Sequence, residues 1–146
     1  MTKPVTPINW TALESPLNEP PLFFIEPRDN DPRPEDARQN EGVTAARKSG
    51  LYVCAILNGE KRGQWAKNLA RKLGAWWGFP DVVAFGSGRF IAITEWKNGT
   101  DMPSQHQIDC MNVLHRLGFP VCVVRNADTW MDWLRDCGAP VRERAV

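Results

Sequence analysis

Hydrophobic and polar positions alternate with two different periods after residue 34, and together they predict a fold of short strands and helices. Apolar residues with helical spacing and end signals predict helices over 34–48, 64–73, 104–117 and 128–136. Apolar runs of strand length cover 51–57, 81–85, 89–97 and 120–124. A Gly-Ser-Gly turn at 86–88 joins the second and third strands as a hairpin. The expected order is α-β-α-β-β-α-β-α, an α/β fold whose mixed β-sheet is flanked by helices.

The first 34 residues differ from this pattern because eight of the 12 prolines fall among them. Proline at that density excludes long helices and central strands. Apolar residues at Trp10 and 22–25 interrupt the segment and could anchor it. Two interpretations remain open: an extended arm over 1–34 that lies on its own subunit or a neighbour, or a flexible tail. Residues 35–146 form the one compact domain.

Length and composition exclude several classes of protein. With 146 residues, 42% hydrophobic and 24% charged, the chain resembles an ordinary globular domain. It has no apolar run near the roughly 18 residues of a membrane span, and its start lacks the apolar core of a secretory signal. We therefore expect a cytoplasmic protein. The four widely spaced cysteines are predicted to be small buried hydrophobes, and Trp76, Trp77, Trp130 and Trp133 are predicted core or interface residues.

The net charge of +1 argues against a protein that only coats nucleic acid, but the positive charge is concentrated locally. Residues 41–75 contain seven basic residues and two acids, a net charge of +5. Such a stripe can bind phosphates without reading sequence, although a solvated helix face has the same composition. The candidate contacts are Asn58, Lys61, Arg62, Lys67 and Arg71.

Glu95, Trp96 and Lys97 end the third predicted strand. Alternation along a strand places Glu95 and Lys97 on one face and Trp96 on the other. Ile91 and Ile93 precede the charged pair on the same face, where burial of a charge is costly unless it has a partner or a task. Taken alone, the tripeptide is more typical of an exposed ion pair at a sheet edge.

Asp81 changes that interpretation. It follows Gly78-Phe-Pro80 at the start of the neighbouring strand, and the hairpin register places it opposite residues 93–95. Two carboxylates then meet at one end of the sheet, with Lys97 beside them. Carboxylates on adjacent positions are typical ligands of a hard divalent cation such as Mg²⁺, which can activate water at a phosphate. The alternative is a Pro-Asp turn beside an unrelated surface pair.

These residues resemble a known family. Gly78-Phe-Pro-Asp81, thirteen further residues and Glu95-Trp-Lys97 resemble the Pro-Asp…Glu-x-Lys core of the PD-(D/E)XK nucleases, whose fold is like that of restriction endonucleases. Within that superfamily the chain is most similar to the VRR-NUC domain, particularly the small stand-alone versions found in phages. The further matches are Glu35-Asp-Ala-Arg-Gln39, Ala55-Ile-Leu-Asn-Gly59 with Lys61-Arg62, Ser104-x-x-Gln107 and Val121-Cys-Val-Val124.

The resemblance covers about residues 35–137 and departs from the family pattern at Leu57 and at 102–104. It implies that Asp81, Glu95 and the backbone carbonyl of Trp96 bind the metal, Mg²⁺ or Mn²⁺. By the same resemblance, Lys97 holds the attacking water, Glu35 supports the metal from the first helix, Gln107 lines the site, and Gln39 joins the nucleic-acid contacts. Asp36 and Glu41 are alternatives to Glu35.

The family resemblance implies a metal-dependent endonuclease that hydrolyses DNA phosphodiester bonds and leaves a 5′-phosphate. Stand-alone members act as homodimers on branched DNA, so cleavage of a Holliday junction or a flap is expected, in a bacterial host cell if the protein is phage-encoded. The sequence leaves two alternatives open. One is a binding module that holds nucleic acid or protein on a nuclease fold, and the other is an enzyme that cleaves RNA.

Overall fold

The computed structural model describes residues 19–56, 65, 68, 69, 72–74, 76 and 78–142. Its elements are β1 (Phe24–Ile25), α2 (Glu35–Lys48), β2 (Tyr52–Ala55), β3 (Val82–Gly86), β4 (Phe90–Trp96), α4 (Gln105–Arg116), β5 (Val121–Val124) and α5 (Ala127–Asp136). The predicted mixed α/β architecture is confirmed, and each predicted element within the described residues is present. The predicted helix over 64–73 lies mostly outside them. Strand β1 was not predicted.

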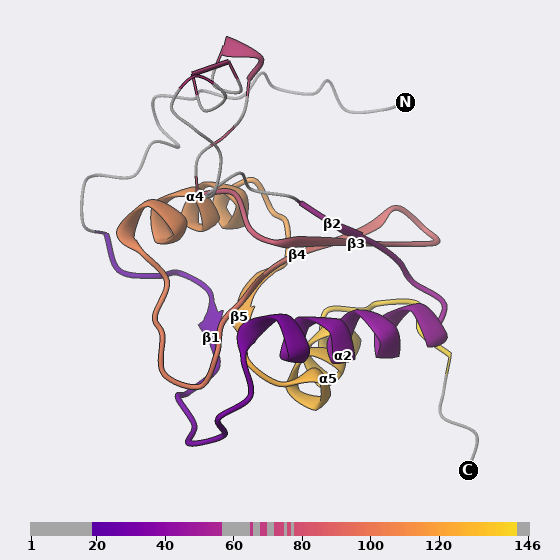
Figure 1. The fold of residues 1–146 in the computed structure, drawn as a ribbon. Coiled ribbons are helices and arrows are strands. Elements are labelled where there is room, and N and C mark those ends of the chain that lie inside the picture. The colour runs from indigo at the N-terminus through magenta and orange to yellow at the C-terminus, as the bar shows by residue number, and fades with distance from the viewer. Residues whose placement is uncertain are drawn as a thin grey trace, which may run out of the picture.

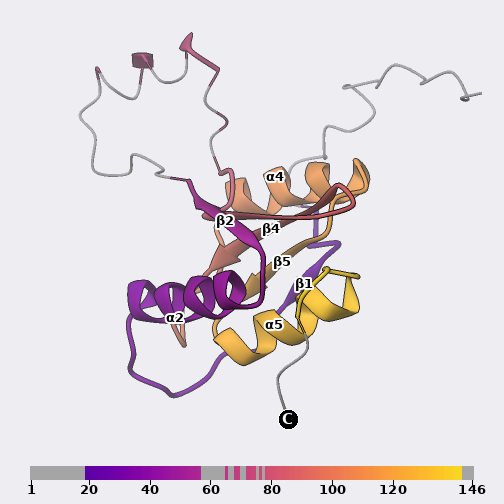
Figure 2. The ribbon, with the colours of Figure 1, turned by 90° about the vertical axis from the view of Figure 1, so that its right-hand side faces the viewer.

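The five strands form one mixed sheet in the order β1-β5-β4-β3-β2. Strand β3 pairs antiparallel with β2 and with β4, whereas β5 pairs parallel with β4 and with β1. Helix α4 makes the crossover from β4 to its parallel neighbour β5 and lies on one face of the sheet (Figure 1). Helices α2 and α5 cover the opposite face, as the turned view also shows (Figure 2).

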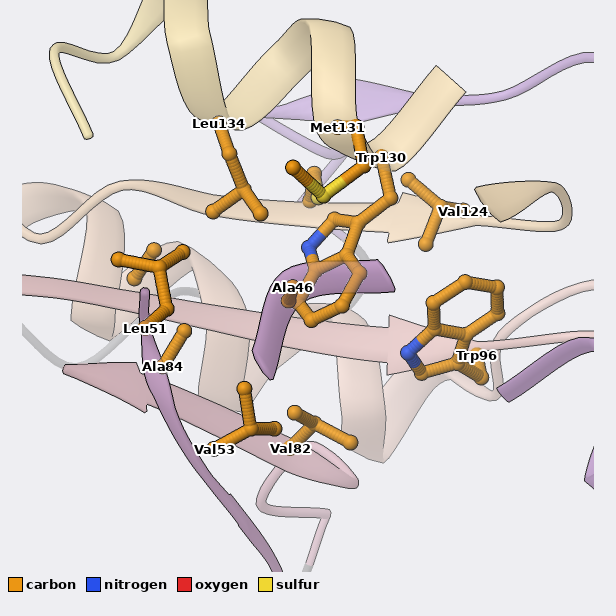
Figure 3. Close-up of a cluster of buried hydrophobic side chains, with 12 residues drawn as sticks. Ala46, Leu51, Val53, Val82, Ala84, Trp96, Val124, Trp130, Met131 and Leu134 are labelled. Atoms are coloured by element: carbon orange, nitrogen blue, oxygen red, sulfur yellow. The ribbon is translucent and has the colours of Figure 1, made fainter. Parts of the chain in front are cut away.

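The core on the α2–α5 face is centred on two tryptophans. Trp96 from β4 and Trp130 from α5 are fully buried and meet edge to face, with ring centroids 5.4 Å apart (Figure 3). The Trp130 indole N–H donates to Thr94 Oγ1 at 3.0 Å. Gly42 of α2 lies directly against the Trp96 ring, and a Cβ atom there would overlap it. The absence of a side chain at Gly42 therefore sets how closely α2 approaches the sheet.

The described part of the proline-rich segment, residues 19–34, packs against the α/β domain of its own chain. Phe24 and Ile25 add β1 beside β5, and the buried Glu26 carboxylate accepts hydrogen bonds from the backbone N–H groups of Arg125 and Asn126 at the start of α5. Asp29 pairs with the fully buried Arg38 of α2 at 2.8 Å. Burial of Arg38 is tolerated because its guanidinium also donates to backbone carbonyl groups. Trp10 lies outside the described residues.

The prediction that all four cysteines are buried needs correction. Cys110 and Cys122 are buried as predicted, but Cys137 is half-buried, and Cys54 is exposed because it lies on the edge strand β2. Trp76 is 41% exposed, with its ring centroid 6.0 Å from that of Phe79, so it is not a core residue and its predicted interface role stays a prediction. Trp130 is a core residue as predicted. None of the described helices has the length and apolar character needed to cross a membrane.

Candidate active site

The β3–β4 hairpin brings Asp81 to Glu95. Val82 pairs with Thr94, so Asp81, one residue before β3, lies level with Glu95 near the end of β4. The Trp96 backbone N–H donates to Asp81 Oδ2 at 2.9 Å. The Asp81 carboxylate therefore accepts a backbone hydrogen bond from β4 that a carbonyl group of a neighbouring strand would otherwise accept. The hairpin register predicted from the turn at 86–88 is confirmed.

Gly78 allows the turn before Asp81 to pack against α4. Its φ of +82° lies in the left-handed region that favours glycine. A Cβ atom at this position would come within 2.6 Å of the His106 carbonyl oxygen in the first turn of α4. The glycine thus lets two segments that are far apart in sequence meet beside Glu95.

Helix α4 contributes Gln107 through its N-terminal cap. Ser104 accepts a hydrogen bond from the Gln107 backbone N–H, and Gln107 Oε1 accepts one from the Ser104 backbone N–H at 2.9 Å, the capping box that the sequence predicted. These bonds fix the side-chain amide of Gln107. Its Nε2 then donates to Glu95 Oε1 at 2.8 Å.

Lys97 completes the group on the Glu95 face. Its Nζ lies 3.5 Å from Glu95 Oε1, and its side chain is only 13% exposed. The Lys97 backbone N–H donates to the Val124 carbonyl at 3.1 Å, which holds the residue after β4 against β5. The predicted alternation is confirmed, because Glu95 and Lys97 contact each other while Trp96 packs in the opposite core. The alternative interpretation, that Glu95 and Lys97 form an exposed ion pair at a sheet edge, is wrong because β4 is a central strand.

The buried Glu95 carboxyl group has an unusual electrostatic environment. Its side chain is 2% exposed. Burial, followed by the negative charge of Asp81, raises the pKa of Glu95 to about 9, although Lys97 acts in the opposite direction. Glu95 Oε2 is buried and receives no hydrogen bond from any described donor. A carboxyl group held in this way binds either a proton or a cation.

Glu35 is the helix carboxylate that acts on this group. It begins α2, and its negative charge contributes to the raised pKa of Glu95. The two alternatives lie elsewhere: Asp36 is exposed, and Glu41 pairs with Arg33 at 2.5 Å. Gln39 lies one helical turn after Glu35 and is half-buried.

The arrangement fits a hard divalent cation with few protein ligands. Asp81 and Glu95 supply two carboxyl groups, and the buried Glu95 Oε2 has no hydrogen-bond partner among the described residues, so it could serve as a ligand. Lys97 directs its backbone N–H toward β5, so Trp96 directs its own carbonyl toward Asp81. Within the described residues, no three His, Cys, Asp or Glu side chains form a group that could hold a metal. Mg²⁺ commonly needs only one or two carboxylates, with water and substrate phosphate as the other ligands.

Five of the predicted nucleic-acid contacts, Asn58, Lys61, Arg62, Lys67 and Arg71, lie outside the described residues. Of the basic stripe, the described members are Arg47, Lys48 and Lys72, and all three are exposed. How the stripe is placed relative to Asp81 and Glu95 stays a prediction.

Arg125 is a positioning residue that the sequence did not reveal. It is fully buried after β5, and its guanidinium donates to the carbonyl groups of Asn98 at 2.5 Å and Asp101 at 2.7 Å. These bonds hold the loop that runs from Lys97 to the Ser104 cap. An arginine after an apolar strand has no sequence signal that separates burial from exposure, since Arg is usually found at the surface.

A scan against protein-family models finds no match, and searches of curated proteins and of solved structures find none either.

Proposed function

We propose that this protein is a divalent-metal-dependent endonuclease that hydrolyses DNA phosphodiester bonds. The observation that carries the proposal is the convergence of Asp81, Glu95 and Lys97 at the end of β4, with one buried Glu95 oxygen that has no hydrogen-bond donor among the described residues. Together with the resemblance to the PD-(D/E)XK nucleases, the chemistry of these three side chains favours this activity over a purely structural role. A binding module would have no use for a buried carboxyl pair of this kind.

Each residue has a separate task in the proposed reaction. Asp81 and Glu95, with the Trp96 carbonyl, would hold Mg²⁺ or Mn²⁺. When bound, the cation would make a coordinated water more acidic and neutralise charge on the phosphate. Lys97 donates hydrogen bonds that orient the attacking water. Gln107 fixes Glu95 Oε1 and leaves Oε2 for the cation.

Hydrolysis forms a bond from the water oxygen to phosphorus and breaks the bond from phosphorus to the 3′ oxygen. The products are a 5′-phosphate and a 3′-hydroxyl group, which takes up a proton. Glu35 adds negative charge near the cation from the first turn of α2. The substrate in this proposal is branched DNA, a four-way junction or a flap. We further propose a homodimer, because two sites related by a two-fold axis can cut symmetric strands.

The test uses labelled four-way junction, flap, duplex and single-stranded DNA, with an RNA strand as a fifth substrate. We expect cleavage of a branched substrate with Mg²⁺ or Mn²⁺ and none in excess EDTA. Asp81→Asn and Lys97→Ala should each lower the cleavage rate by about 100-fold or more while the protein stays folded. Asp132→Asn and Arg135→Ala remove the two members of a surface ion pair on α5 and serve as matched controls with unchanged rates.

Cleavage that continues in EDTA, or that survives both site variants, would overturn the proposal. Binding to DNA with no cleavage of any substrate would identify a binding module instead. Cleavage of the RNA strand alone would correct the substrate.

A further inference from the structure

An open groove lies at the β2 edge of the sheet, away from the Asp81–Glu95 pair. It has a volume of about 630 Å³. Its lining includes Arg47 from the end of α2, Tyr52 and Cys54 from β2, Phe85 from β3 and Arg142 from the C-terminal segment. Two aromatic rings and two cations thus share one surface that the proposed cleavage chemistry does not use.

The two aromatic side chains form one exposed platform. Tyr52 and Phe85 are directly opposite each other across the β2–β3 pair, so their rings are neighbours on the same face of the sheet. Tyr52 is 81% exposed and Phe85 is 44% exposed. Neither belongs to the two hydrophobic cores of the described residues. Large adjoining aromatic rings left in water are typical of a binding surface rather than of a fold requirement.

The charge of the groove is positive. Arg47 and Arg142 line it, and its lining contains no acidic side chain. Arg142 lies over Gly50, where a Cβ atom would be 3.7 Å from its Nε. Arg142 donates a hydrogen bond from its backbone N–H to the Ser49 carbonyl, and its guanidinium lines the groove. A ligand with both flat rings and negative charges matches this surface.

The same groove is poorly suited to an added peptide strand. Arg47 Nη2 donates to the Val53 carbonyl at 3.0 Å, and the Tyr52 and Cys54 backbones face β3. Val53 therefore presents its carbonyl at the outer edge of β2, where Arg47 already occupies it. A covered edge carbonyl and a long charged side chain are the devices that discourage strand addition.

The platform and the candidate active site lie on one face of the sheet. Asp81, Val83 and Phe85 alternate with the residues that face the α2–α5 core, so Phe85 is on the side of Glu95 and α4. Phe85 lies four positions after Asp81, which is roughly 13 Å along the strand.

We propose that this groove binds single-stranded nucleic acid, with bases stacked on Tyr52 and Phe85 and phosphates bound by Arg47 and Arg142. Stacking on an aromatic platform tolerates any base, and the arginines follow the backbone. The link between this groove and cleavage rests on the proposed nuclease function, because the bound strand would be the unpaired part of a branched substrate. Binding itself does not depend on cleavage.

The test measures binding of a fluorescent 12-nucleotide oligothymidylate by anisotropy, in EDTA, with the full chain. We expect Tyr52→Ala and Phe85→Ala each to weaken binding at least about 5-fold, since stacking on one base contributes about 1–3 kcal/mol. Arg142→Ala should weaken binding and reduce its salt dependence. Phe24→Ala is the matched control, because Phe24 is 43% exposed on β1 at the opposite edge of the sheet and should leave the affinity unchanged.

Cys54 provides a second measurement in the unmodified protein. It is exposed in the groove, whereas Cys110 and Cys122 are buried. Bound oligothymidylate should slow alkylation of Cys54 by N-ethylmaleimide at least several-fold. The alkylation rate of the half-buried Cys137 should stay unchanged and serves as the internal reference. Tyr52→Ala should remove most of that protection.

Unchanged oligothymidylate affinity in both aromatic variants would overturn the inference, and so would a wild-type protein that does not bind the oligonucleotide. Protection of Cys54 that rises with protein concentration in the absence of DNA would assign the groove to a second copy and also overturn it. The two proposals fail separately. If Tyr52→Ala loses oligothymidylate binding and the wild type cleaves no substrate, the groove proposal stands and the nuclease proposal is rejected. If the wild type cleaves DNA and Tyr52→Ala binds as tightly as the wild type, the nuclease proposal stands and the groove proposal is rejected.

Discussion

At the scale of the residue, Glu95 is the most informative side chain in the protein. A buried carboxyl group is stable when hydrogen bonds satisfy both of its oxygens. Glu95 Oε1 accepts a hydrogen bond from Gln107 and lies 3.5 Å from the Lys97 ammonium group, but Oε2 has no hydrogen-bond partner among the described residues. Asp81 adds a second negative charge beside it and raises its pKa. A proton shared with Asp81 or a bound cation would each relieve this arrangement.

The raised pKa of Glu95 predicts how stability changes with pH in the absence of metal. The unfolded chain loses this proton near the ordinary value of 4.5, whereas the folded chain keeps it until about pH 9. Between these values the folded state binds more protons, so Glu95 makes stability fall as pH rises. Glu95→Gln keeps the shape without the charge. It should raise the free energy of unfolding by about 1–3 kcal/mol at pH 8 and leave it nearly unchanged at pH 4.

Urea unfolding in EDTA at the two pH values measures this effect. Glu41→Gln, which removes an exposed carboxylate from its surface ion pair with Arg33, is the control for loss of a surface charge. If Glu95→Gln proved less stable than wild type at pH 8, Glu95 would be an ordinary ionised partner of Lys97.

At the scale of the element, the β3–β4 hairpin and the start of α4 build the candidate site. The hairpin sets Asp81 level with Glu95, and the capping box turns Gln107 toward the same carboxyl group. Gly78 permits the contact between the two elements. Its position combines a left-handed φ with a backbone carbonyl 2.6 Å from where a Cβ would lie, so both the angle and the space require glycine.

Gly78→Ala should therefore destabilise the protein and displace Asp81. We expect a loss of about 2–4 kcal/mol, from backbone strain together with the overlap with His106. Gly88→Ala is the matched control, because Gly88 has a φ of +74° but no atom within 4 Å of its Cβ position, so only the strain of about 1 kcal/mol remains. Urea unfolding compares the two variants. Equal losses would mean that the close contact with α4 contributes nothing.

Much at this scale was predictable because the signals are local. The turn at 86–88 fixes the hairpin register, and Ser104 with Gln107 marks the start of α4. Asp81, Glu95, Lys97 and Gln107 were accordingly found by sequence and brought together by the structure. What sequence could not supply depends on distances between remote segments. Strand β1 is two residues long among prolines, and the approach of Gly78 to α4 is set by tertiary packing.

At the scale of the whole molecule, buried charges join the proline-rich segment to the domain. Glu26 binds the start of α5, Asp29 pairs with Arg38, and Arg125 holds the loop after Lys97. These groups lie at the end of the sheet where β4 and β5 finish, next to the candidate site. Their burial was not predictable, since charged residues in a sequence are expected at the surface. The segment over 19–34 thus supports the site's surroundings as well as extending the sheet.

The sheet also organises the proposed functions in space. The Asp81–Glu95 pair lies at one end of β3, and the Tyr52–Phe85 platform lies at the other end on the same face. The proposed cleavage site and the proposed binding groove therefore lie at opposite ends of one strand.

A metal site at Asp81 and Glu95 can be tested by soaking crystals of the protein with Mn²⁺ and measuring anomalous scattering to locate the ion. We predict one strong peak within about 2.0–2.3 Å of oxygens from both Asp81 and Glu95, and no peak there in crystals of Glu95→Gln. Mn²⁺ found only at other positions in wild-type crystals, with the two carboxyl groups still in contact, would contradict the claim that they form a metal site.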